Sequence, residues 1–228
     1  MLLLVTDTSG KHGSVGLVRA SGGVANDDVQ VIESVQLAGG TFSAQLVPQI
    51  AGLLDKHALS KHDLDGFVVI SGPGSFTGLR VGLAAIKGLA EILQKPIVAV
   101  SLLEVVAIAA GAESDVLALL DAGRGEVYAG TYEVSRDAAR VRSEQLLAKS
   151  ELPSVGPGFV VSTPDPGLAD AARQAGLQVR LVTVGADAIA RVGHRKLKAG
   201  ETVAPEQLEA NYIRRSDAEI FSKPETSS

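Results

Sequence analysis

The feature that most restricts the fold is a pattern that occurs twice: an apolar run, an Asp, a turn of small residues and a second apolar run. Residues 2–20 read LLLVTDTSGKHGSVGLVRA, and residues 115–134 read DVLALLDAGRGEVYAGTYEV. Short apolar runs on either side of a Gly-containing turn are typical of two strands paired in a hairpin. We therefore expect an α/β chain with two related lobes, each of which begins with a hairpin.

Both hairpins are followed by alternating strand and helix patterns. In the first half, apolar periodicity predicts strands at 29–38, 66–71 and 96–100 and helices at 44–57, 76–93 and 102–112. In the second half, it predicts strands at 141–148, 158–163 and 177–182 and helices at 167–175 and 186–200. The first helix has Ser43 as its candidate N-cap and carries four large side chains at helical spacing: Leu46, Ile50, Leu53 and Leu54.

No low-complexity linker separates the two halves, so we expect the lobes to share one compact body. We place the first lobe at residues 1–105 and a second, smaller lobe at residues 106–228. The last residues, SKPETSS at 222–228, are expected to form a frayed tail.

Composition and charge exclude several classes of protein. The 228 residues are 46% hydrophobic and 21% charged, and the net charge is −5. Binding nucleic acid by bulk electrostatics alone requires a basic surface, and this charge argues against one. The chain has no Cys, which excludes disulfides, thiolate metal sites and a Cys nucleophile. Its N-terminus, MLLLVTDTSG, reaches Asp7 too early for a signal peptide or a membrane span, so we expect a cytoplasmic protein.

A glycine-rich stretch, SGPGSFTGLRVGLAAIKGLA at 71–90, resembles a phosphate-binding loop only superficially. Gly72, Gly74 and Gly78 give the spacing Gly-x-Gly-x-x-x-Gly, which fits neither the Walker A loop nor the dinucleotide fingerprint. Backbone amides at the start of the following helix could still attract an anion. The favoured interpretation is a tight strand-to-helix turn capped by Ser75 or Thr77.

The helix after this turn is apolar over most of its circumference. Its polar side chains, Arg80, Lys87 and Glu91, form one narrow stripe. One half of the remaining arc carries mostly large residues suited to the lobe's own sheet: Leu79, Leu83, Ile86, Ala90 and Leu93. The other half carries mostly small residues: Gly78, Val81, Gly82, Ala85, Gly88 and Ile92. The small half predicts either close packing within the chain or contact with another subunit.

Catalytic patterns are weak. The four histidines, His12, His57, His62 and His194, lack the i, i+4 spacing of two metal ligands on a helix. There is also no Gly-x-Ser-x-Gly nucleophile elbow. We therefore expect no resident metal and no cofactor.

Two carboxylates are the best acid candidates, because each ends an apolar strand. Asp7 and Asp121 would face each other across a cleft between two lobes and could hold a hydrated Mg²⁺ ion. The alternative is that both only accept hydrogen bonds within turns. A basic run, RVGHRKLK at 191–198, is interpreted as a solvated helix face rather than a phosphate-binding site.

Several segments resemble the TsaB (YeaZ) family of bacterial tRNA threonylcarbamoyladenosine biosynthesis. They are LLLVTDTS, SAQLVPQIAGLL, SGPGSFTGLRVGLAAIKGLA, PIVAVSLLE, LLDAGRGEVYAGTYE and NYIRRS, and they span residues 2 to about 215. The pair GPGSFTGLR and DAGRGEVY is specific for this family. The chain departs from the family at Phe42-Ser43, where His-Ser is common.

The resemblance implies an actin-like ATPase (ASKHA) fold of two ribonuclease-H-like lobes. It also implies a non-catalytic subunit, not an enzyme, that supports a TsaD-like catalytic subunit in threonylcarbamoyl transfer to the adenosine beside the tRNA anticodon. A TsaE-like ATPase joins the assembly, tRNA binds at the level of the complex, and the chain alone forms a homodimer. The family pairs through its first two helices, which gives these partner-binding residues here: Leu46, Ile50, Leu53, Gly78, Val81, Gly82, Ala85, Leu89 and Ile92.

Three alternatives stay open. An actin-like ATPase or phosphotransferase would use a nucleotide site that is vestigial in the first interpretation: Asp7, Ser9, Gly72, Gly74 and Asp121. A glycoprotease-like metallopeptidase would need a ligand set that the sequence does not offer. Direct tRNA binding would use the basic residues of the 191–198 run: Arg191, Arg195, Lys196 and Lys198.

Overall fold

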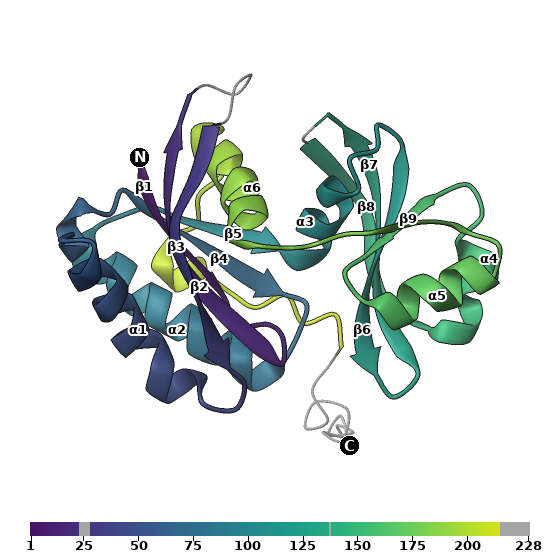
Figure 1. Cartoon of the computed structure of the whole chain (residues 1–228), viewed down its shortest axis with the longest axis horizontal. Coiled ribbons are helices and arrows are strands. Elements are labelled where there is room, and N and C mark those ends of the chain that lie inside the picture. The colour runs from purple at the N-terminus through teal and green to yellow at the C-terminus, as the bar shows by residue number, and fades with distance from the viewer. Residues whose placement is uncertain (23–27, 137, 215–228) are drawn as a thin grey trace, which may run out of the picture.

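A computed structural model describes residues 1–22, 28–136 and 138–214, and the predicted tail at 222–228 lies outside these ranges. The chain forms two lobes, each built on one five-stranded sheet (Figure 1). The first half contains β1 (Leu2–Asp7), β2 (His12–Ser21), β3 (Asp28–Ala38), α1 (Phe42–Lys56), β4 (Gly66–Gly72), α2 (Phe76–Leu93), β5 (Ile97–Ser101) and α3 (Leu102–Ala109). The second half contains β6 (Asp115–Gly123), β7 (Glu126–Ser135), β8 (Ala138–Ala148), α4 (Leu152–Val155), β9 (Val160–Thr163), α5 (Pro166–Gln174), β10 (Gln178–Leu181) and α6 (Ala186–Lys198). Three short 3₁₀ turns complete the described chain: η1 (Lys61–Asp63), η2 (Lys149–Glu151) and η3 (Pro205–Gln207).

The two sheets share one topology. The first has the order β3-β2-β1-β4-β5, and the second reads β8-β7-β6-β9-β10 in the same direction. In each sheet the first three strands are antiparallel neighbours, and the last two run parallel to the first. The parallel strand β4 is buried along its whole length, as expected for a strand covered on both faces. The predicted α/β class with two related lobes is therefore confirmed.

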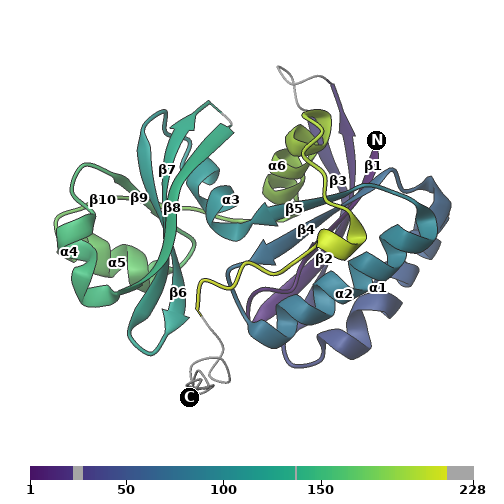
Figure 2. The same cartoon turned by 180° about the vertical axis from the view of Figure 1, so that it is seen from behind.

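The last helix of each half packs on the sheet of the other half. Helix α3 packs on β6 and β7, whereas α6 returns to the first lobe and covers β2, β3 and β5 (Figure 2). Ile189 and Ala190 of α6 belong to the same buried cluster as Leu3 and Val68 of the first sheet. This differs from the predicted division at residue 106, which assigns all of α6 to the second lobe. The apolar face of α6 is buried on the face of the first sheet opposite α1 and α2.

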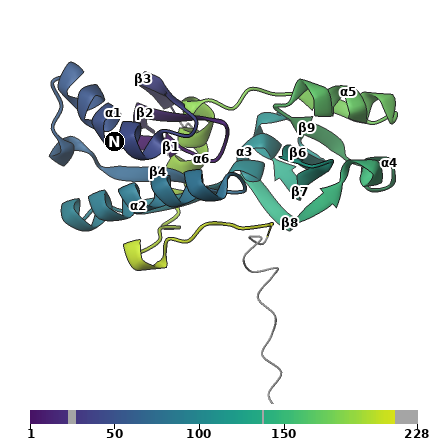
Figure 3. The same cartoon turned by 90° about the horizontal axis from the view of Figure 1, so that it is seen from below.

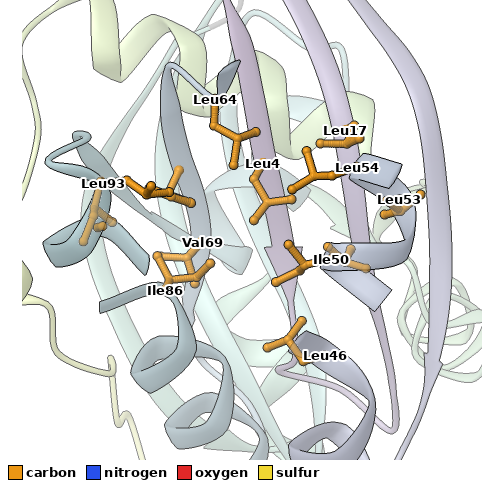
Figure 4. Close-up of a cluster of buried hydrophobic side chains, with 14 of the residues drawn as sticks. Leu4, Leu17, Leu46, Ile50, Leu53, Leu54, Leu64, Val69, Ile86 and Leu93 are labelled. Atoms are coloured by element: carbon orange, nitrogen blue, oxygen red, sulfur yellow. The ribbon is translucent and has the colours of Figure 1, made fainter. Parts of the chain in front are cut away.

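The opposite face of the first sheet is covered by α1 and α2. Figure 4 shows Leu46, Ile50, Leu53 and Leu54 of α1 in one cluster with the sheet residues Leu4, Leu17 and Val69. Leu46, Ile50 and Leu53 are 1%, 4% and 3% exposed. Burial of one such side chain contributes about 1.5–3 kcal/mol to stability. These three residues therefore hold α1 on its own sheet and offer little surface to the partner that the sequence analysis predicts for them.

Glu144 of β8 ties the two lobes together. Its carboxylate accepts hydrogen bonds from Ser101 Oγ and Asn211 Nδ2, both at 2.5 Å, and from the hydroxyl of Tyr132. Ser101 ends β5 of the first lobe, and Asn211 N also donates to Ser71 O at 2.7 Å. Burial, followed by the charge of Glu144, raises the pKa of Tyr132, so the phenol stays a donor. One carboxylate thus joins both sheets to the segment after η3.

Most predicted elements are present, and α2 and β6 have the predicted bounds. Helix α1 starts at Phe42 with Thr41 as its N-cap, so the prediction of Ser43 is wrong. Thr41 Oγ1 donates to Ala38 O at 2.9 Å and accepts from Gln45 Nε2 at 2.8 Å, which fixes the start of the helix. The predicted Ser75 cap of α2 is confirmed, because Gly78 N donates to Ser75 Oγ at 3.3 Å.

Candidate functional site: an apolar helical face and the cleft between the lobes

The two glycines at the start of α2 face the interior of the first lobe. A Cβ at Gly78 would lie 2.1 Å from Thr8 O, and one at Gly82 would lie 2.2 Å from Thr8 Oγ1. Both glycines therefore allow α2 to approach the end of β1, which is buried at Thr8. The predicted contact of Gly78 and Gly82 with a partner helix is therefore not needed to explain these glycines, because Thr8 of the same chain packs against both of them.

The outer side of α1 and α2 is apolar and exposed. Ile92 is 73% exposed and Val47 is 54% exposed. Helix α2 also carries the partly exposed Val81, Ala85 and Leu89, and Gly88, whose Cβ position has no atom within 4 Å. We call this set, Val47, Val81, Ala85, Gly88, Leu89 and Ile92, the α1–α2 face. The two helices run side by side along the first lobe (Figure 3).

An aromatic and cationic stack lies at the start of α2. The guanidinium of Arg80 lies 3.8 Å from the centre of the Phe76 ring, and Phe76 packs on Tyr212 with ring centres 5.0 Å apart. Arg80 Nε also donates to Tyr212 Oη at 3.3 Å. These contacts fix the segment after η3 against α2 and place Phe76 and Tyr212 at the rim of the cleft between the lobes.

The cleft has a volume of about 1100 Å³ and is lined by both lobes. Of the residues predicted for a nucleotide site, Ser9, Gly74 and Asp121 line it. Asp7 is not part of the lining, and Gly72 is buried with its Cβ position 2.6 Å from Asn211 O. The structure thus brings three of the five predicted residues together. The sequence reasoning did not select Lys11, Arg124 or Arg214, which also line the cleft; the segment NYIRRS was a signal for the last of them.

The two predicted acids are engaged within the chain. Asp7 Oδ1 accepts from Ser9 N at 2.8 Å and Ser9 Oγ at 2.6 Å, and burial raises the pKa of Asp7 above its ordinary value. Asp121 forms an ion pair with Lys149 at 2.9 Å, and this contact lowers the pKa of Asp121. Among the described residues, no group of three His, Cys, Asp or Glu side chains is placed to hold a metal ion. Each of the two predicted acids therefore already has a partner within the chain, and of the two only Asp121 lines the cleft.

The basic residues of α6 are largely paired with acids. Lys196 Nζ lies 3.0 Å from Glu104 Oε2, and Arg191 lies 3.9 Å from Asp187. Lys198 is exposed, and Arg195 is partly buried. His194 is fully buried, and His57 contacts Glu33 at 2.8 Å. This arrangement agrees with the interpretation of residues 191–198 as an ordinary helix face.

Phe42, the departure from the family pattern, is a core residue. It is 6% exposed, and its ring lies 2.9 Å from the Cβ position of Gly13 and 3.2 Å from that of Gly78. The ring fills the space between the first hairpin and α2.

No helix in residues 1–22, 28–136 or 138–214 is long and apolar enough to cross a membrane.

The doubled sheet order, the exchanged helices and the cleft define a two-lobed protein of the ribonuclease-H-like, actin-like class. The model of the TsaD family, tRNA N6-adenosine threonylcarbamoyltransferase, matches residues 35–156. The chain belongs to that family and, within it, to the TsaB (YeaZ) group.

Relatives of this group match different shares of the chain. It is 36% identical to the tRNA threonylcarbamoyladenosine biosynthesis protein TsaB of Bacillus subtilis over 135 residues, 58% of this chain and 56% of that protein. It is 26% identical to TsaB of Escherichia coli over 231 residues, 96% of each. The solved structure of YeaZ from Pseudomonas aeruginosa has a TM-score of 0.71 at 27% identity, over 92% of this chain and all of that one. A second Pseudomonas aeruginosa protein, described as similar to peptidase YeaZ, has a TM-score of 0.73 at 28% identity, over 93% and 99%.

Proposed function

We propose that the chain is a non-catalytic subunit that takes part in tRNA threonylcarbamoyladenosine biosynthesis. It supports threonylcarbamoyl transfer to the adenosine beside the anticodon by binding a TsaD-like catalytic subunit. The names of the Bacillus subtilis and Escherichia coli relatives support the process. A non-catalytic role is supported by the two acids, because Ser9 and Lys149 already occupy them.

The observation that carries this proposal is the exposure of the α1–α2 face. Of the six large hydrophobic side chains that are exposed among the described residues, Val47 and Ile92 belong to this face. Contiguous exposed apolar side chains are typical of a surface that binds another protein. A second helix that packs on this face would approach closely at Gly88, where the Cβ position is open.

The same face accounts for the other proposed partners. The chain alone forms a homodimer through the α1–α2 face, which makes the homodimer and the TsaD-like complex mutually exclusive. A TsaE-like ATPase and tRNA then join at the level of the complex. In this arrangement the first lobe carries the partner-binding helices, and the second lobe closes the other side of the cleft.

Reconstitution tests this function. Purified chain, TsaD-like subunit and TsaE-like ATPase are mixed with unmodified tRNA and a threonylcarbamoyl donor, and modified adenosine is quantified. We expect product only when the chain and the TsaD-like subunit are both present, and none from the chain with tRNA and donor alone. Full modification without the chain would contradict the proposed support role, and modification by the chain alone would show that it is an enzyme.

A further inference from the structure

The segment after η3 connects the first lobe to the second for a third time. The chain already passes between the lobes from β5 to α3 and from β10 to α6. Residues 208–214 then run from beside α2 towards β6 of the second lobe (Figure 2). We call residues 208–214 the strap. Its start is held by apolar burial, whereas the rest of it is held mainly by polar contacts.

The start of the strap is an apolar anchor. Leu208 is 1% exposed and belongs to the same buried cluster as Leu4 and Phe67 of the first sheet. Just before the strap, Val203 N donates to Ile97 O at 2.9 Å, so the chain is already attached to the edge strand β5. Moving this end away from the sheet would expose a buried leucine to water. The anchor therefore stays in place as long as the first lobe is folded.

The middle of the strap bonds to both lobes through one residue. Asn211 N donates to Ser71 O of β4 at 2.7 Å, which attaches the backbone to the first lobe. Asn211 Nδ2 donates to Glu144 Oε2 of β8 at 2.5 Å, which attaches the side chain to the second lobe. The separation of the lobes at this point is therefore set by the length of one Asn side chain.

The residues after Asn211 extend this bridge in both directions. Tyr212 packs on Phe76 at the start of α2, with ring centres 5.0 Å apart, and its hydroxyl accepts from Arg80 Nε at 3.3 Å. Two residues further on, Arg214 donates to Glu126 of β7. The strap thus contacts the start of α2 and the second lobe within four residues.

These contacts open more easily than the anchor. Residues 209–214 belong to no helix or strand, and each of them is at least partly exposed. A segment of this kind opens locally at a lower free energy than the sheets beside it. Because the β5–α3 and β10–α6 connections remain, such an opening leaves both lobes folded and connected.

We infer that the strap fixes the angle between the lobes and the start of α2 together, and that its release frees both together. In the closed state Asn211 holds the lobes at the angle seen here, and Tyr212 holds Phe76 and Arg80. Loss of the contact between Asn211 and Glu144 releases both, because Asn211 and Tyr212 are neighbours in one segment. A ligand that prefers one state of the strap at α2 then also favours the matching angle between the lobes. The inference does not depend on the proposed partner, because the isolated full chain is sufficient to test it.

The distance between the lobes is measured with two spin labels by pulsed electron spin resonance. The chain has no Cys, so Lys61→Cys on η1 and Asp170→Cys on α5 label one exposed site in each lobe. Asn211→Ala removes the bond to Glu144, and Glu209→Ala is the matched control at an exposed position of the same strap. We expect one narrow distance distribution in the parent and in Glu209→Ala, and a distribution about twofold wider in Asn211→Ala.

Hydrogen exchange in the same variants tests the connection to α2. In Asn211→Ala, amides of the strap and of residues 79–83 in α2 should exchange about tenfold faster than in Glu209→Ala. Amides of β1 and β6, at the centres of the two sheets, should keep the parent rates. This second measurement separates release of the strap from a general loss of stability, which would raise exchange in both sheets.

Asn211→Asp places a carboxylate against Glu144 and should widen the distribution further than Asn211→Ala does. Three results would overturn the inference. The first is a distance distribution in Asn211→Ala that matches Glu209→Ala. The second is a wider distribution with unchanged exchange in α2, and the third is faster exchange throughout both sheets. Because Asn211 is partly exposed, Asn211→Ala remains decisive if Asn211→Asp fails to fold.

Discussion

The two lobes have the same order of strands and helices but opposite outer surfaces. In the first lobe, the helices that follow the third and fourth strands expose Val47 and Ile92. In the second lobe, the helix at the corresponding place after the fourth strand is α5. Its outer side carries an ion pair between Asp170 and Arg173 at 2.9 Å, and Leu168, Ala169 and Ala172 are buried. One topology is therefore compatible with either a charged or an apolar exterior.

This difference separates what the fold requires from what a partner requires. A helix on a sheet needs one apolar stripe, and α5 has only that. Helix α2 has a buried stripe containing Leu79, Leu83 and Ile86, and a second apolar side that the chain leaves exposed. The second lobe folds without such a side, which supports the proposal that the α1–α2 face binds a partner.

The largest effect is expected from testing the two sides of α2 with the same substitution. Gly82→Leu would place its Cβ 2.2 Å from Thr8 Oγ1, and we expect this clash to destabilise the fold by roughly 3 kcal/mol or more. Gly88→Leu meets no atom within 4 Å at its Cβ, so it should leave the free energy of unfolding unchanged or slightly raised. Urea unfolding of both variants checks this. Equal destabilisation would contradict the assignment of an inner and an outer side.

A smaller loss of stability is expected when the lobes are uncoupled. Glu144→Ala removes the acceptor shared by Ser101, Tyr132 and Asn211 and leaves the buried Tyr132 hydroxyl without it. We expect destabilisation by about 2 kcal/mol and faster hydrogen exchange at the end of β5. Glu144→Gln, which keeps one oxygen acceptor, is the matched control and should lose less. If both variants melt like the wild type, Glu144 does not couple the lobes.

The smallest effects are expected at Asp7 and Asp121, which occupy corresponding strand ends but have pKa shifts of opposite sign. The pKa of Asp7 in the folded protein is raised above its ordinary value of 3.8. Ionised Asp7 therefore destabilises the folded state at neutral pH, and this effect disappears as the pH falls below 3.8, where Asp7 is protonated in both states. The pKa of Asp121 is lowered, so its stabilising contribution is present above 3.8 and is lost as the pH falls through its folded-state pKa.

The opposite pKa shifts of Asp7 and Asp121 can be tested by replacing each acid with Asn, which carries no charge. At about pH 7, Asp7→Asn should raise the free energy of unfolding and Asp121→Asn should lower it, and both differences should shrink as the pH approaches 3. The amide introduced by Asp7→Asn keeps one oxygen that accepts from Ser9, so the turn is retained. Changes of the same sign in the two variants would show that the two strand ends have the same electrostatic environment.

The fold was predictable from the sequence because its signals are local. Apolar runs and turn residues gave the doubled strand order and the bounds of α2, and Ser75 marked its cap. The exchange of α3 and α6 was not predictable, because periodicity identifies an apolar face but not the sheet that buries it. Helix α4 was not predicted either, because its four residues are too few to show a helical period.

The candidate site was predictable only in part. A helical wheel shows that Gly82 and Gly88 both lie on the side of α2 with small residues. It does not show that Thr8 packs against Gly82 while the space at Gly88 is open. Similarly, an Asp at a strand end indicates an acid, but its partners Ser9 and Lys149 determine what that acid can bind. The cleft cations were missed because they are distant in sequence and meet only in the folded chain.

The affinity of the TsaD-like subunit for two matched variants tests the central claim most directly. Val47 on helix α1 and Val141 on strand β8 are 54% and 56% exposed, so Val→Glu changes the same side chain at about the same exposure in each lobe. We predict that Val47→Glu weakens binding about 30-fold or more, corresponding to roughly 2 kcal/mol, while Val141→Glu binds like the wild type. Equal affinities for the two variants, with both monomers folded, would contradict the assignment of the α1–α2 face as the partner-binding surface.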